Sequence, residues 1–334
     1  MTDAEPIERL EFDAQALVTE HPPVWRDRNK QVVHAIACPP GAVHRGTLRY
    51  ARWGALPLPE HTEPGPAPTR VIARPGFFDY GPVLQAPDAL EWHVNFADPH
   101  LFVAYGSPLF AQDEMQVAEH PALGSLKEAL DARGLRARTV DGHRPTPVLV
   151  MGVERRCRVA TEPSAAEGRP HGLYGNAFAW ASQEAIRRAT TRIDPPTVSN
   201  LIAMAAPSGG YGRYTPSQIE HVLVTAFTGF RAAVLESERF RGAPCPVVVH
   251  TGFWGCGAFG GHRVLMTLLQ VLAARMAGID VLAFHYGDES GVAAFHAVET
   301  LLREELAPSR AQSPRDLIQA IAELGYEWGV SDGN

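Results

Sequence analysis

Two adjacent acidic residues, Asp113 and Glu114, open a helical stretch of the sequence. Acidic side chains at the start of a helix usually complement the positive end of its dipole or are solvated. Hydrolysis of a glycosidic bond, however, requires a carboxyl group that protonates the leaving oxygen and then activates water. The residues alone leave both interpretations open.

A glycine-rich turn is the second candidate, because residues 250–262 read HTGFWGCGAFGGH between an apolar stretch and a helical one. Glycine has no Cβ, so successive N–H groups can face one concavity, and the following helix adds its positive end. This pattern indicates a cradle for an anion such as phosphate. The large rings of Phe253, Trp254 and Phe259 either form a wall for a flat ligand or only pack within a tight turn.

Gly255, Gly257 and Gly260 also fit the pattern G-x-G-x-x-G, so a nicotinamide-dinucleotide oxidoreductase is an alternative. In that fold an acidic residue after the next strand binds the ribose, and only Asp288 is suitably placed here. Too little chain follows to complete a doubly wound sheet. A P-loop is excluded because no G-K-[ST] sequence closes the turn, and we expect no cofactor.

Other reactive side chains do not form a recognisable site. The cysteines are scattered and the histidines form no H-E-x-x-H sequence, so we expect neither a disulfide framework nor a metal site. Cys256 lies near the start of a helix, where a thiol can become a nucleophile, but we interpret it as structural.

The elements that must position these groups alternate between strands and helices. Strands are predicted at 71–73, 92–97, 147–153, 200–206, 246–250 and 280–286. Helices are predicted at 112–132, with interruptions at Pro121 and Gly124, and at 215–237, 262–277, 289–306 and 313–328. This alternation predicts a three-layer α/β/α domain with a parallel or mixed sheet, over residues 71–334.

The first 70 residues have a different character. Residues 58–69 read LPEHTEPGPAPT, which cannot sustain a helix or a central strand because proline removes a donor and fixes φ. Before this loop, residues 6–20 have roughly helical apolar spacing and residues 31–38 predict a strand. We therefore predict an accessory segment over residues 1–70 that caps or wraps the domain.

Composition narrows the classes of partner. The 334 residues include 30 Lys and Arg against 37 Asp and Glu, a formal net charge of −7. This balance argues against a broad nucleic-acid surface. No run of about eighteen apolar residues and no leader pattern is present, so we expect no membrane span and a cytoplasmic protein.

Two motifs resemble the poly(ADP-ribose) glycohydrolase family, of which the chain looks like a divergent, bacterial-like member. TGFWGCGAFGG resembles the diphosphate-binding loop of the family, and FHYGD at 284–288 resembles its F-x-F-G-D strand end. The resemblance implies that Tyr286 packs near bound ADP-ribose. It implies the following loop residues as ligand contacts: Thr251, Gly252, Phe253, Trp254, Gly255, Cys256, Gly257, Ala258, Phe259, Gly260 and Gly261.

The acidic pair fits the same resemblance. The V-D-F-A-N, triple-glycine, Q-E-E and N-P-E-L elements of the family fall without gaps on residues 94–98, 102–104, 112–114 and 120–123. On this register Glu114 takes the place of the acid/base glutamate, and Asp113 that of a glutamate that holds ribose hydroxyls. The resemblance also implies ligand contacts from Gln112, Asn95, Asp98 and, through the mobile tyrosine loop of the family, Tyr174.

The sequence departs from the family at several places, among them the exchange of its Asp and Asn into Asn95 and Asp98 and the replacement of an acidic residue by His262. Phe102, Val103 and Ala104 replace the three glycines, and we expect their side chains to narrow or reshape that wall of the site. Asp113 is shorter than glutamate by one methylene, about 1.3–1.5 Å of reach. The resemblance implies a macrodomain-like fold and hydrolysis of the C1″ bond of poly- or mono-ADP-ribosylated substrates. A catalytically weakened ADP-ribose-binding module is the alternative that these departures favour.

Overall fold

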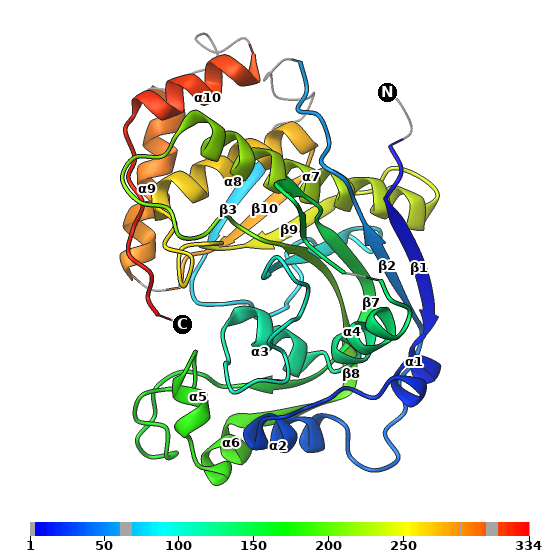
Figure 1. Ribbon diagram of the computed structural model, residues 1–334. Helices are drawn as coiled ribbons and strands as arrows, with labels where there is room; N and C mark the ends of the chain where they lie inside the picture. The colour runs from blue at the N-terminus through cyan, green and yellow to red at the C-terminus, as the bar shows by residue number, and fades with distance from the viewer. Residues whose placement is uncertain (1–3, 61–68, 136, 288, 305–312, 334) are drawn as a thin grey trace.

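The computed structural model describes residues 4–60, 69–135, 137–287, 289–304 and 313–333. Its centre is an eight-stranded mixed sheet with the order β1-β2-β7-β8-β4-β9-β10-β3 (Figure 1). The strands are β1 Glu8–Asp13, β2 Thr47–Arg52, β3 Arg70–Arg74, β4 Leu90–Phe96, β7 Val148–Val159, β8 Thr190–Met204, β9 Val247–Thr251 and β10 Val281–His285. The short strands β5 (Val140–Asp141) and β6 (Arg144–Pro145) pair separately.

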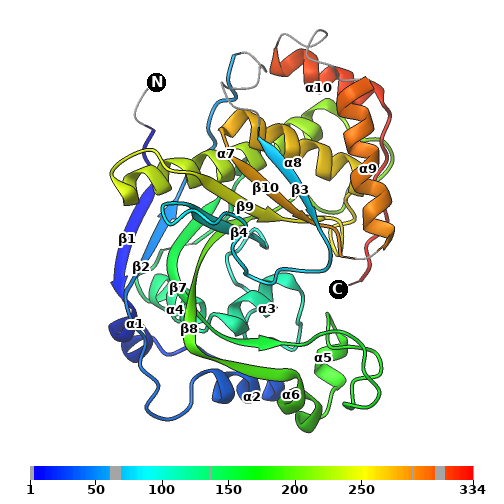
Figure 2. The same ribbon diagram turned by 180° about the vertical axis from the view of Figure 1, so that it is seen from behind.

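Helices lie on both faces of this sheet (Figure 2). One layer contains α7 (Pro216–Arg241), α8 (Arg263–Ala277), α9 (Glu289–Glu304) and α10 (Pro314–Glu323). The other face carries α1 (Ala14–Glu20), α2 (Arg28–Ala37), α3 (Gln112–Glu119), α4 (Ala122–Ala132), α5 (Ala177–Trp180) and α6 (Gln183–Ala189). Side chains of β8 alternate between the two layers, with Ile202 in one core and Leu201 in the other. The predicted three-layer α/β/α architecture is confirmed.

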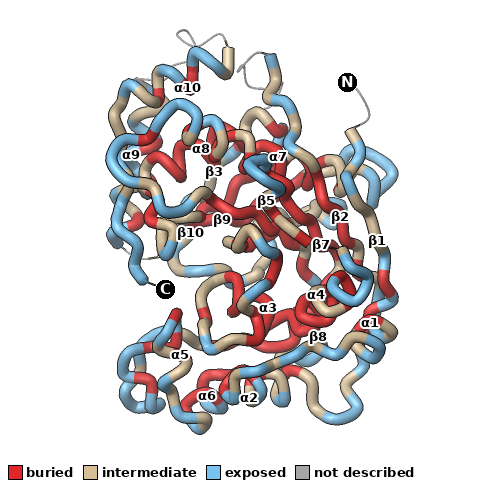
Figure 3. Tube along the Cα trace, in the orientation of Figure 1, coloured by how far each residue is buried: buried red, intermediate tan, exposed pale blue. Residues whose placement is uncertain are grey.

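The direction of the strands decides where a site can form. β8, β4, β9, β10 and β3 are mutually parallel, so their carboxyl ends meet at one edge of the sheet. Ligands of parallel α/β sheets bind outside this edge. Figure 3 shows that the buried residues follow the central strands, while exposed residues surround them.

Two predictions in the first 70 residues are wrong. Of residues 6–20, predicted as helical, residues 8–13 form strand β1 and only residues 14–20 form a helix, α1. Residues 31–37, predicted as a strand, lie in helix α2, and Cys38 is its C-cap. The α2 helix is capped by the Asp27 carboxylate, which accepts hydrogen bonds from the N–H groups of Asn29 and Lys30. Its buried Val33 and Ala37 are four residues apart, so the apolar run is one face of a helix.

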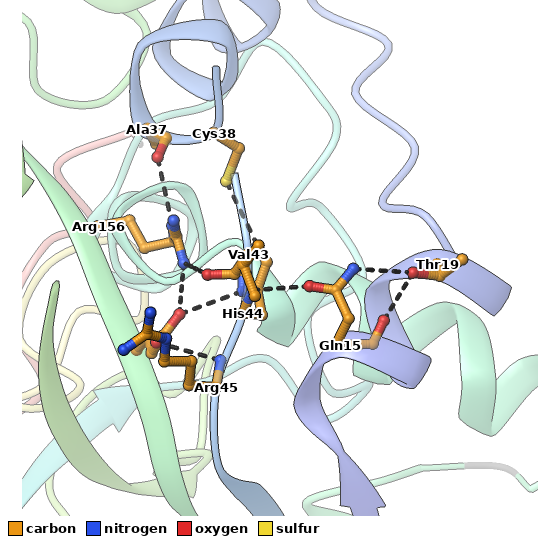
Figure 4. A network of polar contacts seen from close by, with 9 residues as sticks. Gln15, Thr19, Ala37, Cys38, Val43, His44, Arg45 and Arg156 are labelled. Atoms are coloured by element: carbon orange, nitrogen blue, oxygen red, sulfur yellow. Dashed lines mark hydrogen bonds and ion pairs between the residues drawn. The ribbon is translucent and has the colours of Figure 1, made fainter. Parts of the chain in front are cut away.

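The first 70 residues supply two strands of the main sheet rather than lying outside it. β1 pairs with β2, and β2 pairs with β7, both antiparallel. Figure 4 shows a second connection, in which Arg156 of β7 donates to the carbonyls of Ala37 (3.3 Å) and Val43 (3.1 Å). The Arg156 guanidinium also pairs with Glu154. Strands from both sides of the predicted boundary at residue 70 therefore belong to one sheet.

The remaining predicted elements are present, with shifted ends. The helical stretch at 112–132 is broken at Pro121 into α3 and α4, whereas Gly124 lies inside α4. Helix α7 begins with the predicted cap, since the Thr215 hydroxyl accepts from the N–H of Gln218. Across the described ranges, no helix combines the length and apolarity needed to cross a membrane.

Candidate active site

The start of α3 is fixed against the carboxyl end of β4 by the side chain of Gln112. Its Nε2 donates to the carbonyl of Val94 (3.0 Å), and its Oε1 accepts from the N–H of Phe96 (2.7 Å). Both ends of this amide are therefore engaged by the strand. Gln112 thereby fixes the first turn of α3, which carries the acidic pair, and its predicted ligand contact stays a prediction.

The acidic pair is buried at the first turn of α3. Asp113 is 6% exposed and Glu114 is 4% exposed. The amide of Asn95 donates to Oδ1 of Asp113 (3.0 Å) and to Oε1 of Gln116 (2.9 Å). The Glu114 Oε2 accepts from the backbone N–H of Ala111 (3.1 Å). Three of the predicted site residues thus lie together: Asn95, Asp113 and Glu114.

Burial raises the pKa of both carboxyl groups. The pKa of Asp113 lies well above its ordinary value, first because of burial and second because of the charge of Glu114. Burial also raises the pKa of Glu114, and Lys30 is the largest opposing influence. A carboxyl group with a raised pKa retains its proton closer to neutral pH, which is the state that a general acid needs.

Lys30, which the sequence analysis missed, supplies positive charge to this pair from helix α2. The side chain is fully buried, and its Nζ donates to the carbonyl of Tyr105 (2.7 Å). Burial lowers the pKa of Lys30 to about 8, against the raising effect of Glu114 and then Asp113. The sequence signal for this role is that Lys30 precedes Val33 by three residues and so lies on the same buried face of a helix. Predicting a strand over residues 31–38 hides this helical spacing.

The loop at residues 102–104 has one residue with a glycine-like backbone. Phe102 has a φ of 54°, in the left-handed region, yet its side chain is fully buried in the core. Val103 is 53% exposed. The ring of Phe102 thus packs into the core and only Val103 is substantially exposed, and the expected change in the wall of the site stays a prediction.

The glycine-rich loop between β9 and α8 has the shape that its sequence predicts. Gly255 and Gly260 have φ values of 77° and 71°. A Cβ on Gly255 would lie 2.5 Å from the Cβ of Ala206, too close for any side chain. The loop closes on itself through a bond from the N–H of Gly261 to the carbonyl of Gly255 (2.8 Å).

Several N–H groups of this loop donate no hydrogen bond to another described residue. Among the hydrogen bonds between described residues, none has the N–H of Gly255, Gly257, Ala258 or Phe259 as its donor. Three of these four groups are consecutive. A turn with successive unengaged N–H groups can bind an anion through its backbone alone.

The aromatic residues of the loop have different surroundings. Trp254 is fully buried and donates to the carbonyl of Met204 (2.9 Å), so it is a core residue and not a wall for a ligand. Phe253 packs edge-on against Phe284 with ring centroids 5.2 Å apart. Phe259 is partly buried against the same core as Trp254.

Other predicted contacts of this region serve the framework. The Thr251 hydroxyl donates to Gln270 of α8 (2.5 Å), and the carbonyl of Gly252 accepts from the same side chain (3.0 Å). Burial raises the pKa of Cys256 to about 12, so its thiol stays protonated and the structural interpretation holds. Asp98 is half-exposed and accepts from the N–H of His100 (2.8 Å), and its charge helps to raise the pKa of Asp113 and of Glu114.

Two tyrosines flank the candidate site. The loop of Tyr174 is fixed by a bridge between Gly175 and Phe110, just before α3. Burial raises the pKa of Tyr174 to about 12, and Glu114 adds to the shift, while a hydrogen bond from the N–H of Gln112 opposes it. Tyr174 therefore lies beside the acidic pair. Tyr286 follows β10 at the same sheet edge, and Asp288 lies outside the described residues.

Buried histidines pack against one another next to the site. The rings of His93 and His250 stack with centroids 4.2 Å apart and planes 12° from parallel. Burial holds the pKa of His93 well below its ordinary value. Within the described ranges, no three or more His, Cys, Asp or Glu side chains are arranged to hold a metal ion.

The fold is a three-layer α/β/α architecture with a candidate site at one edge of its mixed sheet. Residues 169–292 match the family described as poly (ADP-ribose) glycohydrolase (PARG), Macro domain fold. This match confirms the resemblance over a range that includes Tyr174, the glycine-rich loop and Tyr286, and it begins only after the acidic pair.

Solved structures with a similar fold carry the same family name. The chain is similar to poly(ADP-ribose) glycohydrolase from Thermomonospora curvata, at 15% identity over 85% of this chain and 98% of that one, with a TM-score of 0.44. It is also similar to the Deinococcus radiodurans protein in complex with ADP-ribose, at 12% identity over 91% and 97%, with a TM-score of 0.39. At these sequence identities and TM-scores, the two solved structures assign no role to any residue of this chain.

Proposed function

We propose that the protein is an ADP-ribose glycohydrolase that cleaves the C1″ glycosidic bond of ADP-ribosyl groups. The observation that carries the proposal is the meeting of two features at one sheet edge. The glycine-rich loop, within the matched range, offers backbone donors for a diphosphate, and the buried Asp113 and Glu114 lie at the end of the neighbouring strand. Because backbone N–H groups can bind an anion without Lys or Arg, the net charge of −7 does not argue against diphosphate binding.

The proposed mechanism assigns the two carboxyl groups different tasks. Asp113, oriented by Asn95, holds the hydroxyls of the ribose. Glu114 in its protonated form donates its proton to the departing oxygen while the C1″ bond breaks through an oxocarbenium-like state. The resulting carboxylate then accepts a proton from the attacking water, which restores the acid. The positive charge of Lys30 stabilises that carboxylate between the two steps.

Around this centre, the backbone N–H groups of Gly255 and of residues 257–259 bind the diphosphate, while Tyr286 and Tyr174 flank the ligand. ADP-ribosylated molecules are the proposed substrates. An ADP-ribose-binding module without turnover is the second candidate. The engagement of Asp113 by Asn95 and of Glu114 by Ala111 favours it, because neither carboxylate is free of internal bonds.

Calorimetric titration with ADP-ribose, followed by release assays on mono- and poly-ADP-ribosylated proteins, separates these candidates. Glu114→Gln keeps the shape of the side chain but removes the titrating proton, so we expect binding within about twofold of wild type and a loss of turnover of about 100-fold or more. Glu20→Gln, an exposed change on α1, is the matched control. Undiminished turnover by Glu114→Gln would falsify the mechanism, and absence of ADP-ribose binding would remove both candidates.

A further inference from the structure

Residues 328–333, which follow α10, lie along the glycine-rich loop. The N–H of Gly329 donates to the carbonyl of Gly260 (2.8 Å), and the N–H of Trp328 donates to the carbonyl of Gly212 (2.8 Å). The Trp328 ring stacks on Tyr214 with centroids 4.3 Å apart and planes 13° from parallel. In Figure 1 the red segment after α10 runs down beside α9 toward α5.

The far end of this segment reaches the other side of the candidate site. A Cβ on Gly257 would lie 3.0 Å from Oδ2 of Asp332. The carbonyl of Gly333 accepts from the side chain of Asn176 (3.2 Å), two residues after Tyr174. The charge of Asp332 also raises the pKa of Tyr174. Residues 328–333 therefore bridge the loop that offers N–H donors and the loop that carries Tyr174.

A carboxylate beside Gly257 stands where an incoming diphosphate has to approach. Like charges repel one another. For two unit charges 4 Å apart in water, this repulsion weakens binding affinity by roughly a factor of five. We propose that residues 328–333 form an autoinhibitory strap, in which Asp332 competes with the ligand diphosphate for the glycine-rich loop and has to move for binding. This inference rests on the proposed function of that loop.

The strap has an anchored end and an exposed end. Trp328 is held by the stack on Tyr214, whose hydroxyl also accepts from the N–H of His262 (3.1 Å). Residues 329–333 are all exposed, and Val330 is 92% exposed. Moving this part of the chain thus uncovers little apolar core, and the two glycines that border it, Gly329 and Gly333, allow the backbone to turn.

The test compares ADP-ribose affinities of full-length variants by calorimetry at low and high salt. Asp332→Asn removes the charge but keeps the shape, so we expect an affinity about threefold to tenfold higher than wild type at low salt. This gain shrinks at high salt because exposed charges are screened. Asp332→Glu keeps the charge and is expected to bind as wild type does. Asp88→Asn changes one exposed carboxylate just before β4, at the opposite edge of the sheet, and is the matched control.

A second variant, ending after Gly329, removes the carboxylate together with its backbone, and thermal unfolding checks that it remains folded. The strap predicts an affinity at least as high as that of Asp332→Asn, for ADP-ribose and for inorganic diphosphate. Equal affinity in wild type, Asp332→Asn and the shortened chain overturns the strap and leaves the proposed function standing. Weaker binding by either variant overturns it as well. Failure of every variant to bind ADP-ribose overturns the proposed function and the strap with it.

Discussion

The loops after β4 and β9 reach the same edge of the sheet, yet they are built in opposite ways. The loop after β9 is shaped by Gly255 and Gly260, and it leaves backbone N–H groups unengaged among the described residues. The loop after β4 is held by side chains: Phe102 fills the core, Lys30 binds its carbonyls, and Gln112 clamps its end to the strand. One loop presents its backbone to a ligand, whereas the other positions carboxyl groups.

This difference explains how one loop accommodates Phe102, Val103 and Ala104 whereas the other requires glycines. In the loop after β9, a side chain at Gly255 has no space. In the loop after β4, the buried ring of Phe102 contributes packing that offsets the cost of its positive φ. The two loops therefore respond differently to substitution, and three predictions follow from that contrast.

The largest expected effect concerns the packing of Phe102. Phe102→Gly relieves the positive φ but removes a fully buried ring, so we expect the free energy of unfolding to fall by about 3 kcal/mol. Val103→Gly, at the exposed neighbouring position, is the matched control and is expected to cost about 1 kcal/mol or less. Urea unfolding of both variants measures the difference. Equal stability of the two would show that the loop after β4 is not held by its side chains.

The sequence predicts the loop after β9 better than the loop after β4, because glycines shape the first locally and distant side chains hold the second. Glycine spacing and the apolar strand before it are local, so the cradle at 252–261 is visible in the residues themselves. The strand and helix alternation after residue 70 is equally local, and it was confirmed. The inward orientation of Phe102 and the burial of Trp254 depend on neighbours far along the chain, such as Met204. No local pattern reports such contacts.

Lys30 illustrates the same limit at the acidic pair. Its contact with the carbonyl of Tyr105 joins residues 75 positions apart. The apolar run at 31–38 fits a strand as well as a short helix, and only the tertiary structure decides between them. The acidic pair itself was located by resemblance, since two acids at a helix start are common. The structure adds their burial, the hydrogen bond from Asn95 to Asp113 and the positive charge beside them.

The second prediction concerns the buried charge of Lys30. Its pKa falls from the ordinary value of 10.5 to about 8 in the folded protein. Between these values the unfolded chain keeps a proton that the folded chain releases, so stability rises with pH from about 8 to 10.5, by about 3 kcal/mol at most. Lys30→Met has no such group and is expected to lack this rise. Denaturant unfolding at several pH values in this window measures it.

Lys127→Met is the control for this prediction, because Lys127 is paired with Asp131 on the surface of α4. It is expected to keep the pH dependence of wild type. Loss of the positive charge also raises the pKa of Glu114 further, since Lys30 opposes that shift. The pH at which hydrolysis declines as the general acid loses its proton therefore moves upward in Lys30→Met. If this variant gains stability between pH 8 and 10.5 as steeply as wild type, Lys30 does not carry the buried charge.

The third and smallest effect concerns the backbone of the glycine-rich loop. Gly255→Ala places a Cβ 2.5 Å from Ala206 at a φ of 77°, and we expect the loop to shift and ADP-ribose affinity to fall about 30-fold, or about 2 kcal/mol. Gly209→Ala has a similar φ of 71° but no heavy atom within 4 Å, so it tests the strain without the clash. Calorimetry on both variants separates the two contributions. Because the proposed donors are backbone N–H groups, unchanged affinity in Gly255→Ala would mean that the diphosphate is held elsewhere.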